Sequence, residues 1–198
     1  MSDQYFVEGR DRAHSLGNSG SLILDGNGRV DDRILETYWR CGFYVFEGAL
    51  SSTERNELVS DFEALLDRLP MGRGSKVDHQ GRPAAGLGFK RPSFRFAKPL
   101  SDPHGGSDLS GGRYESKMTE PTPPDDAPDE VLLNISGCLQ LMDACLRLYG
   151  HPKLLRVAEA INGPDFTPFT DTVWVKQAGL GPSVAWHQDG TTHWDKPD

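Results

Sequence analysis

The residues best suited to chemistry lie in the stretch V-A-W-H-Q-D-G-T-T-H-W-D, from Val184 to Asp195. Within it, His187 and Asp189 form an H-x-D pair directly after a short apolar run. Side chains alternate faces along an extended strand, so an imidazole and a carboxylate two residues apart can bind one ion together. Non-haem iron(II) oxygenases use two histidines and one carboxylate on one face of the metal, which leaves the other face open. The H-x-D pair therefore supplies two of the three ligands that such a site needs.

The third ligand is not identified by the H-x-D pair itself. His193 follows in a second H-x-D, and six extended residues span about 20 Å. The chain would have to reverse direction within residues 190–192, Gly-Thr-Thr, for His193 to reach the same ion as His187 and Asp189. We interpret His193 as a surface histidine. A self-contained zinc or iron site of His187, Asp189 and His193 is the alternative.

Composition and charge narrow the class of protein. The chain has 198 residues, enough for one domain or one domain with an extension, and a formal net charge of -8. An acidic surface repels phosphates, so we expect no nucleic-acid partner. The first residues lack a secretory signal, no window is apolar for long enough to span a bilayer, and three cysteines form no C-x-x-C pair. We expect a cytoplasmic protein with a small-molecule substrate and no membrane partner.

Local signals predict a helical first half. A helix should begin at the Asp31/Asp32 cap and end at Gly42, followed by a buried strand at Phe43–Phe46. Ser51 and Glu54 form a capping-box pattern that predicts a second helix, continuing to Pro70 and Gly72.

Two stretches lack a clear period. Residues 1–29 are polar and rich in glycine, and we predict a flexible arm with one short strand at residues 22–24. Residues 71–130 are rich in Gly, Pro, Ser and charge, and we predict an irregular, lid-like segment. It contains the compact cluster G-F-K-R-P-S-F-R-F, which ends at Phe96.

The last third of the chain changes from helical to strand periodicity. An apolar stripe from Val131 to Tyr149 predicts a helix, on which Cys138 and Cys145 would lie as small buried hydrophobes. Pro152 predicts the start of another helix that stops before Gly163. Residues 172–176 then alternate as a half-buried strand, and the turn at residues 181–182 leads into the H-x-D strand. Helices followed by strands predict an α+β fold, and residues 30–198 form one domain in this interpretation.

Three of these stretches resemble the phytanoyl-CoA dioxygenase family of iron(II)/2-oxoglutarate oxygenases. They are Y-W-R-C-G-F-Y-V-F-E-G-A-L-S-S-T-E-R-N-E-L from Tyr38, L-Y-G-H-P-K-L-L-R-V-A-E-A-I-N-G-P from Leu148, and V-W-V-K-Q-A-G-L-G-P-S-V-A-W-H-Q-D-G-T from Val173. Together they cover roughly half of the chain, and their order is more specific than any one of them.

The resemblance implies a double-stranded β-helix, or jelly roll, with helices packed on one sheet. It implies that His187 and Asp189 bind iron(II), and that 2-oxoglutarate and dioxygen are consumed while a substrate C–H bond is hydroxylated. The family's second histidine and its basic anchor for 2-oxoglutarate lie on later strands that these 198 residues do not match. The resemblance therefore covers the N-terminal part of such an enzyme. It implies an incomplete barrel, and a chain that is inactive by itself.

Further contacts are predicted around that centre. In related enzymes polar residues near Lys176 contact 2-oxoglutarate. Trp174 and Trp186 are candidates for the substrate pocket, and Phe94 with Arg95 could bind an anionic substrate from the lid. The alternatives are a solvated lysine, tryptophans that only pack, and an ordinary edge strand at residues 94–96.

Two other functions are consistent with the sequence. A non-catalytic relative would keep the helical scaffold and act as a binding or scaffold protein. A metal-dependent hydrolase would use His187, Asp189 and His193 around a bound water.

Overall fold

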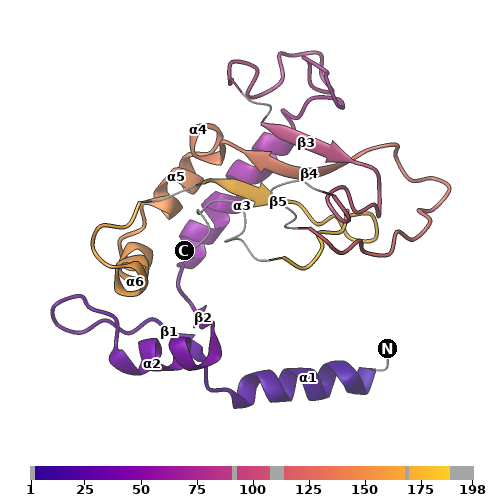
Figure 1. The fold of residues 1–198 in the computed structure, drawn as a ribbon. Helices are drawn as coiled ribbons and strands as arrows, with labels where there is room; N and C mark the ends of the chain where they lie inside the picture. The colour runs from indigo at the N-terminus through magenta and orange to yellow at the C-terminus, as the bar shows by residue number, and fades with distance from the viewer. Residues whose placement is uncertain (1–2, 91–92, 108–113, 168–169, 188–198) are drawn as a thin grey trace, which may run out of the picture. The chain divides into compact units, whose positions relative to one another are not determined.

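The computed structural model describes residues 3–90, 93–107, 114–167 and 170–187. They form helices and short strands, as the α+β prediction requires (Figure 1). The chain divides into two compact units, Met1–Phe62 with Met142–Thr170, and Glu63–Leu141 with Asp171–Asp198. No helix in the described ranges is long and apolar enough to cross a membrane.

The described residues of unit 1 form a two-stranded parallel sheet, four whole helices and most of a fifth. Strands β1 (Ser19–Ser21) and β2 (Val45–Glu47) pair with Ser19 opposite Val45. The helices are α1 (Asp3–Ser15), α2 (Asp32–Cys41), α5 (Asp143–Tyr149), α6 (Pro152–Asn162) and most of α3 (Ser52–Leu66). The N-terminal residues thus contain a helix where the sequence predicts a flexible arm, and the paired strand is Ser19–Ser21 and not the predicted 22–24, where Leu24 forms only an isolated bridge with Val30.

The helix boundaries of unit 1 follow from local chemistry. Asp31 accepts a hydrogen bond from the Arg33 amide at 2.9 Å, and Gly42 ends α2 with a φ of 81°. The predicted capping box is present, because Glu54 accepts from the Ser51 amide at 2.7 Å and the Glu54 amide donates to the Ser51 hydroxyl at 3.2 Å. The predictions for α2 and α6 are confirmed, and α3 begins as predicted but ends at Leu66, before Pro70. The predicted buried strand at residues 43–46 is wrong in its bounds and burial, because β2 covers Val45–Glu47 and Phe43 and Val45 are exposed.

Unit 2 is built on a three-stranded antiparallel sheet. Its order is β3 (Phe94–Ala97), β4 (Val131–Ser136), β5 (Thr172–Trp174), with an irregularity between Arg95 and Phe96 (Figure 1). The predicted helix over residues 131–150 is wrong. Its first part is the central strand β4, and it is followed by two short helices, α4 (Cys138–Leu141) and α5, which carry Cys138 and Cys145 separately.

The segment before β3 is more ordered than the sequence predicts. Residues 77 and 83 form an isolated β-bridge around a loop held by Asp78, which is fully buried. The Asp78 carboxylate accepts hydrogen bonds from the Gln80 and Arg82 amides, both at 2.9 Å, and ion pairs with Arg68 and Arg82. A buried carboxylate with this many donors fixes the loop around it.

The strand predicted to carry the H-x-D pair is not found in the described residues. Residues 181–187 follow β5 without regular secondary structure. Asp189 lies outside the described residues, and the double-stranded β-helix stays a prediction.

Candidate functional site

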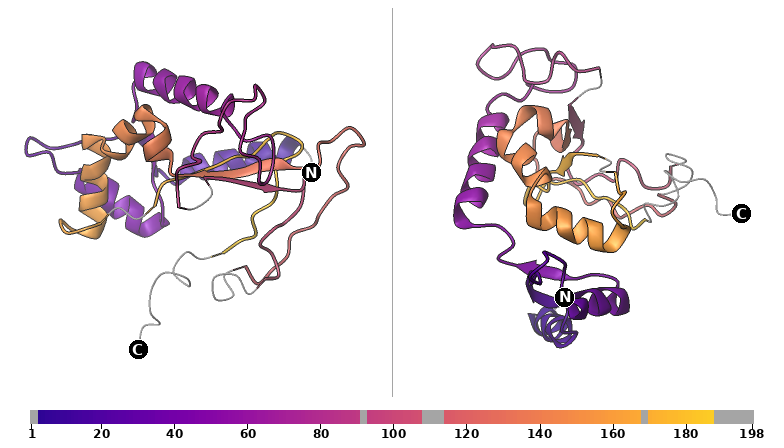
Figure 2. Two further views of the ribbon diagram at one scale, coloured as in Figure 1. Left: turned by 90° about the horizontal axis from the view of Figure 1, so that it is seen from above. Right: turned by 90° about the vertical axis from the view of Figure 1, so that its left-hand side faces the viewer.

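The antiparallel sheet of unit 2 brings three chain segments to one edge. The end of β3, the start of β4 and the end of β5 lie at the same edge, and the loops that follow β3 and β5 leave from it (Figures 1 and 2). Two backbone hydrogen bonds join these loops, from the Leu100 amide to the Leu180 carbonyl at 2.9 Å and from the Ser183 amide to the Ser101 carbonyl at 2.7 Å. Residues far apart in sequence therefore meet here.

A cluster of four rings occupies this edge. The His104 ring stacks on the Tyr114 ring, with centroids 5.0 Å apart, and meets the Trp174 ring edge-on at 6.3 Å. Tyr114 also packs against His187, with 4.9 Å between the ring centroids. Tyr114 is buried and bridges the two imidazoles. The structure thus places His187 against Tyr114, in a row of rings that continues through His104 to Trp174.

The His187 ring has a defined orientation. Its Nδ1 lies 2.8 Å from the backbone oxygen of Ala185, which is itself buried. A carbonyl oxygen only accepts hydrogen bonds, so Nδ1 carries the proton of this interaction. In the neutral ring the lone pair then belongs to Nε2. Metal-binding histidines are commonly oriented in this way, with one nitrogen donating to a carbonyl and the other facing the ion.

A cavity of about 800 Å³ lies in the same unit. Small-molecule sites typically have volumes of roughly 300–1,000 Å³, so it has the size of one. It is formed by the ordered loop before β3, by β3 itself and by the residues after β3. The lining residues are Pro70, Gly72, Arg73, Gly74, Ser75, Lys76, Ala84, Ala85, Gly86, Leu87, Phe89, Lys90, Ser93, Phe94, Arg95, Phe96, Pro103, His104 and Leu133.

The side chains that line this cavity and carry a full charge are all cationic. Its lining includes four cationic side chains and no aspartate or glutamate. Arg73 is compensated by Glu130, with 3.2 Å between Nε and Oε1, and it also donates to the Phe96 carbonyl at 2.9 Å. Within the described parts of the chain, Lys76, Lys90 and Arg95 form no ion pair. Three positive charges therefore remain on the cavity without a protein counter-charge there.

Two polar side chains near these charges are buried and unsatisfied. Ser93 lines the cavity, is 5 % exposed, and its hydroxyl has no hydrogen-bond partner among the described residues. Asn134 is 3 % exposed, and its Oδ1 also has no partner there. The register places Asn134 between Arg95 on β3 and Trp174 on β5, so these three residues share one face of the sheet. That row links the cavity to the ring cluster.

Only some of the site residues predicted from the sequence lie at the cavity or in the ring cluster. Phe94 and Arg95 line the cavity, and Trp174 belongs to the ring cluster. Trp186 is 90 % exposed. Lys176 donates from Nζ to the Pro182 carbonyl, so it is tied to its own loop. Asp189 and His193 lie outside the described residues.

Sequence reasoning missed four residues of the site. His104, Tyr114, Ser93 and Lys90 received no role, although Ser93 and Lys90 lie within the G-F-K-R-P-S-F-R-F cluster that also contains Arg95. The alternation of cationic and aromatic residues in that cluster was a usable signal for Lys90. His104 and Tyr114 lie in irregular sequence, and only the fold brings them to His187.

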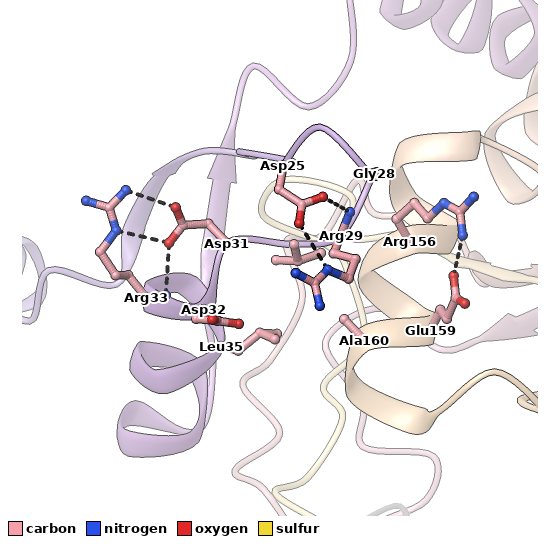
Figure 3. Close-up of a pocket in the computed structure, with 11 residues that line it drawn as sticks. Asp25, Gly28, Arg29, Asp31, Asp32, Arg33, Leu35, Arg156, Glu159 and Ala160 are labelled. Atoms are coloured by element: carbon pink, nitrogen blue, oxygen red, sulfur yellow. Dashed lines mark hydrogen bonds and ion pairs between the residues drawn. The ribbon is translucent and has the colours of Figure 1, made fainter.

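A second pocket, in unit 1, is a weaker candidate. Its volume is about 580 Å³ and it is lined by the residues around Asp25–Leu35 and by part of α6 (Figure 3). Its arginines face their own carboxylates, Arg29 at 3.0 Å from Asp25, Arg33 at 2.9 Å from Asp31 and Arg156 at 2.7 Å from Glu159 (Figure 3).

Hydrogen bonds from Arg29 lower the pKa of Asp25 in this pocket. The hydrogen bonds from the Arg33 side chain and amide lower the pKa of Asp31 to about 2. Because each arginine is already compensated, this pocket offers little net attraction for a charged ligand.

Within the described ranges, no group of three or more His, Cys, Asp or Glu side chains could hold a metal ion. Comparisons with protein-family models, curated proteins and solved structures find no match.

Proposed function

We propose that this chain belongs to a non-haem iron(II)/2-oxoglutarate-dependent dioxygenase that hydroxylates an unactivated C–H bond of a small organic substrate. The observation that carries the proposal is the orientation of His187, whose Nδ1 is held at 2.8 Å by the Ala185 carbonyl. That contact leaves the lone pair of the neutral ring on Nε2, which would be the ligand atom. Together with Asp189, His187 would supply two of the three protein ligands of a facial triad.

The surroundings of His187 support the same proposal. When bound, iron(II) with 2-oxoglutarate would supply the oxidation of a substrate C–H bond by dioxygen. The chain's own residues would orient and shield the site: the Ala185 carbonyl fixes the ring of His187, and Tyr114 packs against it. Oxygenase chemistry benefits from a site that excludes water, and aromatic neighbours serve that purpose.

Non-catalytic ligand binding is the second candidate function. It is favoured by the cavity of unit 2, whose lining is present within the described residues, whereas the candidate metal centre has one described ligand there. A binding protein would need the cavity but no iron, so the two functions differ in whether iron(II) is required. The hydrolase alternative needs His193 in addition to His187 and Asp189.

Anaerobic titration of the purified chain with iron(II) and 2-oxoglutarate tests the proposal. A chelated complex should give a weak visible charge-transfer band, and the band should disappear in His187→Ala and in Asp189→Ala. His14→Ala is the matched control, because His14 is an exposed histidine of α1. It should leave the band unchanged.

Two results would contradict the oxygenase proposal. One is no band at saturating iron and 2-oxoglutarate, and the other is a band that survives both ligand substitutions. Loss of the band in His193→Ala, with Asp189→Ala unaffected, would favour a different ligand set.

A further inference from the structure

We propose that the unit 2 cavity binds a small organic anion with an apolar body, through Lys90, Arg95 and the buried Ser93 hydroxyl. A carboxylate or a phosphate monoester would satisfy the same contacts. That this anion is the substrate rests on the proposed function. That the cavity binds the anion can be measured without metal.

The charge distribution is the first argument. The protein as a whole carries a formal net charge of -8, yet the cavity lining contains only cationic charged side chains. Glu130 compensates Arg73, while Lys76, Lys90 and Arg95 have no ion-pair partner within the described ranges. Like charges on one surface repel each other, and a bound anion removes that repulsion. The uncompensated cations of this cavity would therefore attract an anion locally, although the protein as a whole is acidic.

The buried hydroxyl of Ser93 is the second, independent argument. Burying a hydroxyl without a hydrogen bond is unfavourable, so buried polar groups without partners are uncommon. Ser93 lies where β3 begins, and its carbonyl accepts from the Ser136 amide at 2.7 Å, which fixes its backbone. A ligand oxygen in the cavity would accept the hydrogen bond that the Ser93 hydroxyl does not make within the protein.

Ser93 also packs closely against Gly86. Gly86 has a φ of 73°, and a Cβ at this position would collide with the Ser93 hydroxyl and lie 2.9 Å from its Cβ. Only glycine allows this close approach without strain. The loop containing Gly86 therefore packs directly against Ser93 and forms one wall of the cavity.

The remaining walls are apolar. Phe89, Phe94, Phe96, Leu87 and Leu133 line the cavity together with prolines and alanines. A few polar groups within a mostly apolar lining are typical of sites that bind the body of a ligand by burial and its charged group by hydrogen bonds. Arginine among aromatic side chains suits a planar anionic group in particular. The ligand class is thus an organic anion and not a bare inorganic ion.

Binding of matched probes in metal-free buffer tests the inference. We would use isothermal titration calorimetry at low ionic strength with 3-phenylpropionate, phenyl phosphate and the neutral 3-phenylpropanol. Both anions should bind, and the alcohol should bind at least about tenfold more weakly, because it cannot form a charge-assisted hydrogen bond. Comparing the two anions decides between carboxylate and phosphate.

Substitutions locate the site. Arg95→Gln and Lys90→Gln should each weaken binding of the preferred anion about tenfold, and Ser93→Ala about fivefold. Arg95→Lys keeps the charge and should recover part of the loss. Lys153→Gln is the control, since Lys153 is an exposed lysine on α6 of unit 1. Circular dichroism would verify that each variant folds.

The inference is overturned if neither anion binds, if the alcohol binds as tightly as the anions, or if Lys153→Gln reduces affinity as much as Lys90→Gln. None of these outcomes involves iron. A failed anion titration with an intact iron band would reject the cavity inference alone, and the reverse result would reject the oxygenase proposal alone.

Discussion

At the scale of single residues, a five-residue turn with the same hydrogen bonds occurs twice in the chain. Residues 25–29 read D-G-N-G-R and residues 78–82 read D-H-Q-G-R. In each loop the aspartate accepts hydrogen bonds from the amides two and four residues later and from the arginine Nε. The glycines have φ angles of 77° and 75°. The aspartate accepts the hydrogen bonds of its own loop, and the glycine three residues later adopts the left-handed conformation that the turn requires. Both interactions are local, so they favour this hairpin turn wherever the pattern occurs.

The two loops differ in burial, and that difference gives Asp78 the larger structural role. Asp25 is partly exposed, while Asp78 is fully buried and also contacts Arg68, 3.1 Å from its Oδ2. Burial acts to raise the pKa of Asp78, but the hydrogen bonds from Arg82 and Gln80 outweigh it and lower the pKa to about 2. The ionised form is therefore the one that the folded protein stabilises.

Asp78→Asn should destabilise the protein in a pH-dependent way. A carboxyl group whose pKa is lowered on folding contributes stability above its unfolded pKa, about 3.8, and loses it as the pH falls toward about 2. The difference in urea midpoint between wild type and Asp78→Asn should be full at pH 7 and shrink between about pH 4 and pH 2.

Asp126→Asn is the control for that series, because Asp126 is an exposed aspartate of the same unit. It should leave the midpoint unchanged across the pH range. A difference between wild type and Asp78→Asn that stays constant from pH 7 to pH 2 would show that the lost ionisation is not its cause.

At the scale of elements, strand β4 organises unit 2. It pairs with β3 on one side and β5 on the other, and its residues from Val131 to Ile135 are all buried. Central strands covered on both faces carry apolar residues on both faces, unlike the alternating strands of half-exposed sheets, and Asn134 is the polar exception between Val131 and Ile135. Gly137 ends the strand with a φ of 79°, which allows α4 to begin directly afterwards.

Ile135→Ala should be strongly destabilising. Ile135 is completely buried, and truncating such a side chain leaves a cavity in a packed core, so we expect a loss of about 3 kcal/mol in the free energy of unfolding. Denaturant titration would measure it. Val59→Ala in α3, where the side chain is half exposed, should change stability by less than about 0.5 kcal/mol. Equal effects of the two substitutions would contradict the central position of β4.

At the scale of the whole molecule, the chain forms two units that are each discontinuous in sequence. Unit 1 has its own buried residues, including Val30, Ile34 and Ala144, and unit 2 has those around β4. Helix α3 crosses from one unit to the other at residues 62 and 63. Units with separate cores can open with different free energies even when a continuous helix connects them.

Hydrogen exchange should show that the two units open independently of each other. Ile34→Ala removes a buried side chain of α2 and should speed amide exchange in residues 32–41, while exchange in residues 131–136 stays as in the wild type. Ile135→Ala should show the reverse pattern. Mass spectrometry of peptic fragments would measure both. Equal loss of protection in both ranges for each variant would mean that the chain unfolds as one cooperative unit.

The sequence by itself determined the elements whose ends are fixed by neighbouring residues. The Asp31 cap and Gly42 bound α2, Ser51 with Glu54 starts α3, and Pro152 starts α6, because each signal acts within one helical turn. The pattern D-x-x-G-R was equally local and could have been recognised. Arg95 and Phe94 line a cavity, and their predicted role as substrate contacts stays a prediction.

Only the tertiary structure decided the identity of β4 and the composition of the site. Val131–Ile135 has the spacing of a helix stripe as well as that of a buried strand, and pairing with β3 and β5 made it a strand. His104, Tyr114, Trp174 and His187 meet because antiparallel pairing brings their segments to one edge. Such contacts depend on burial and on pairing between residues far apart in sequence, which no local pattern specifies.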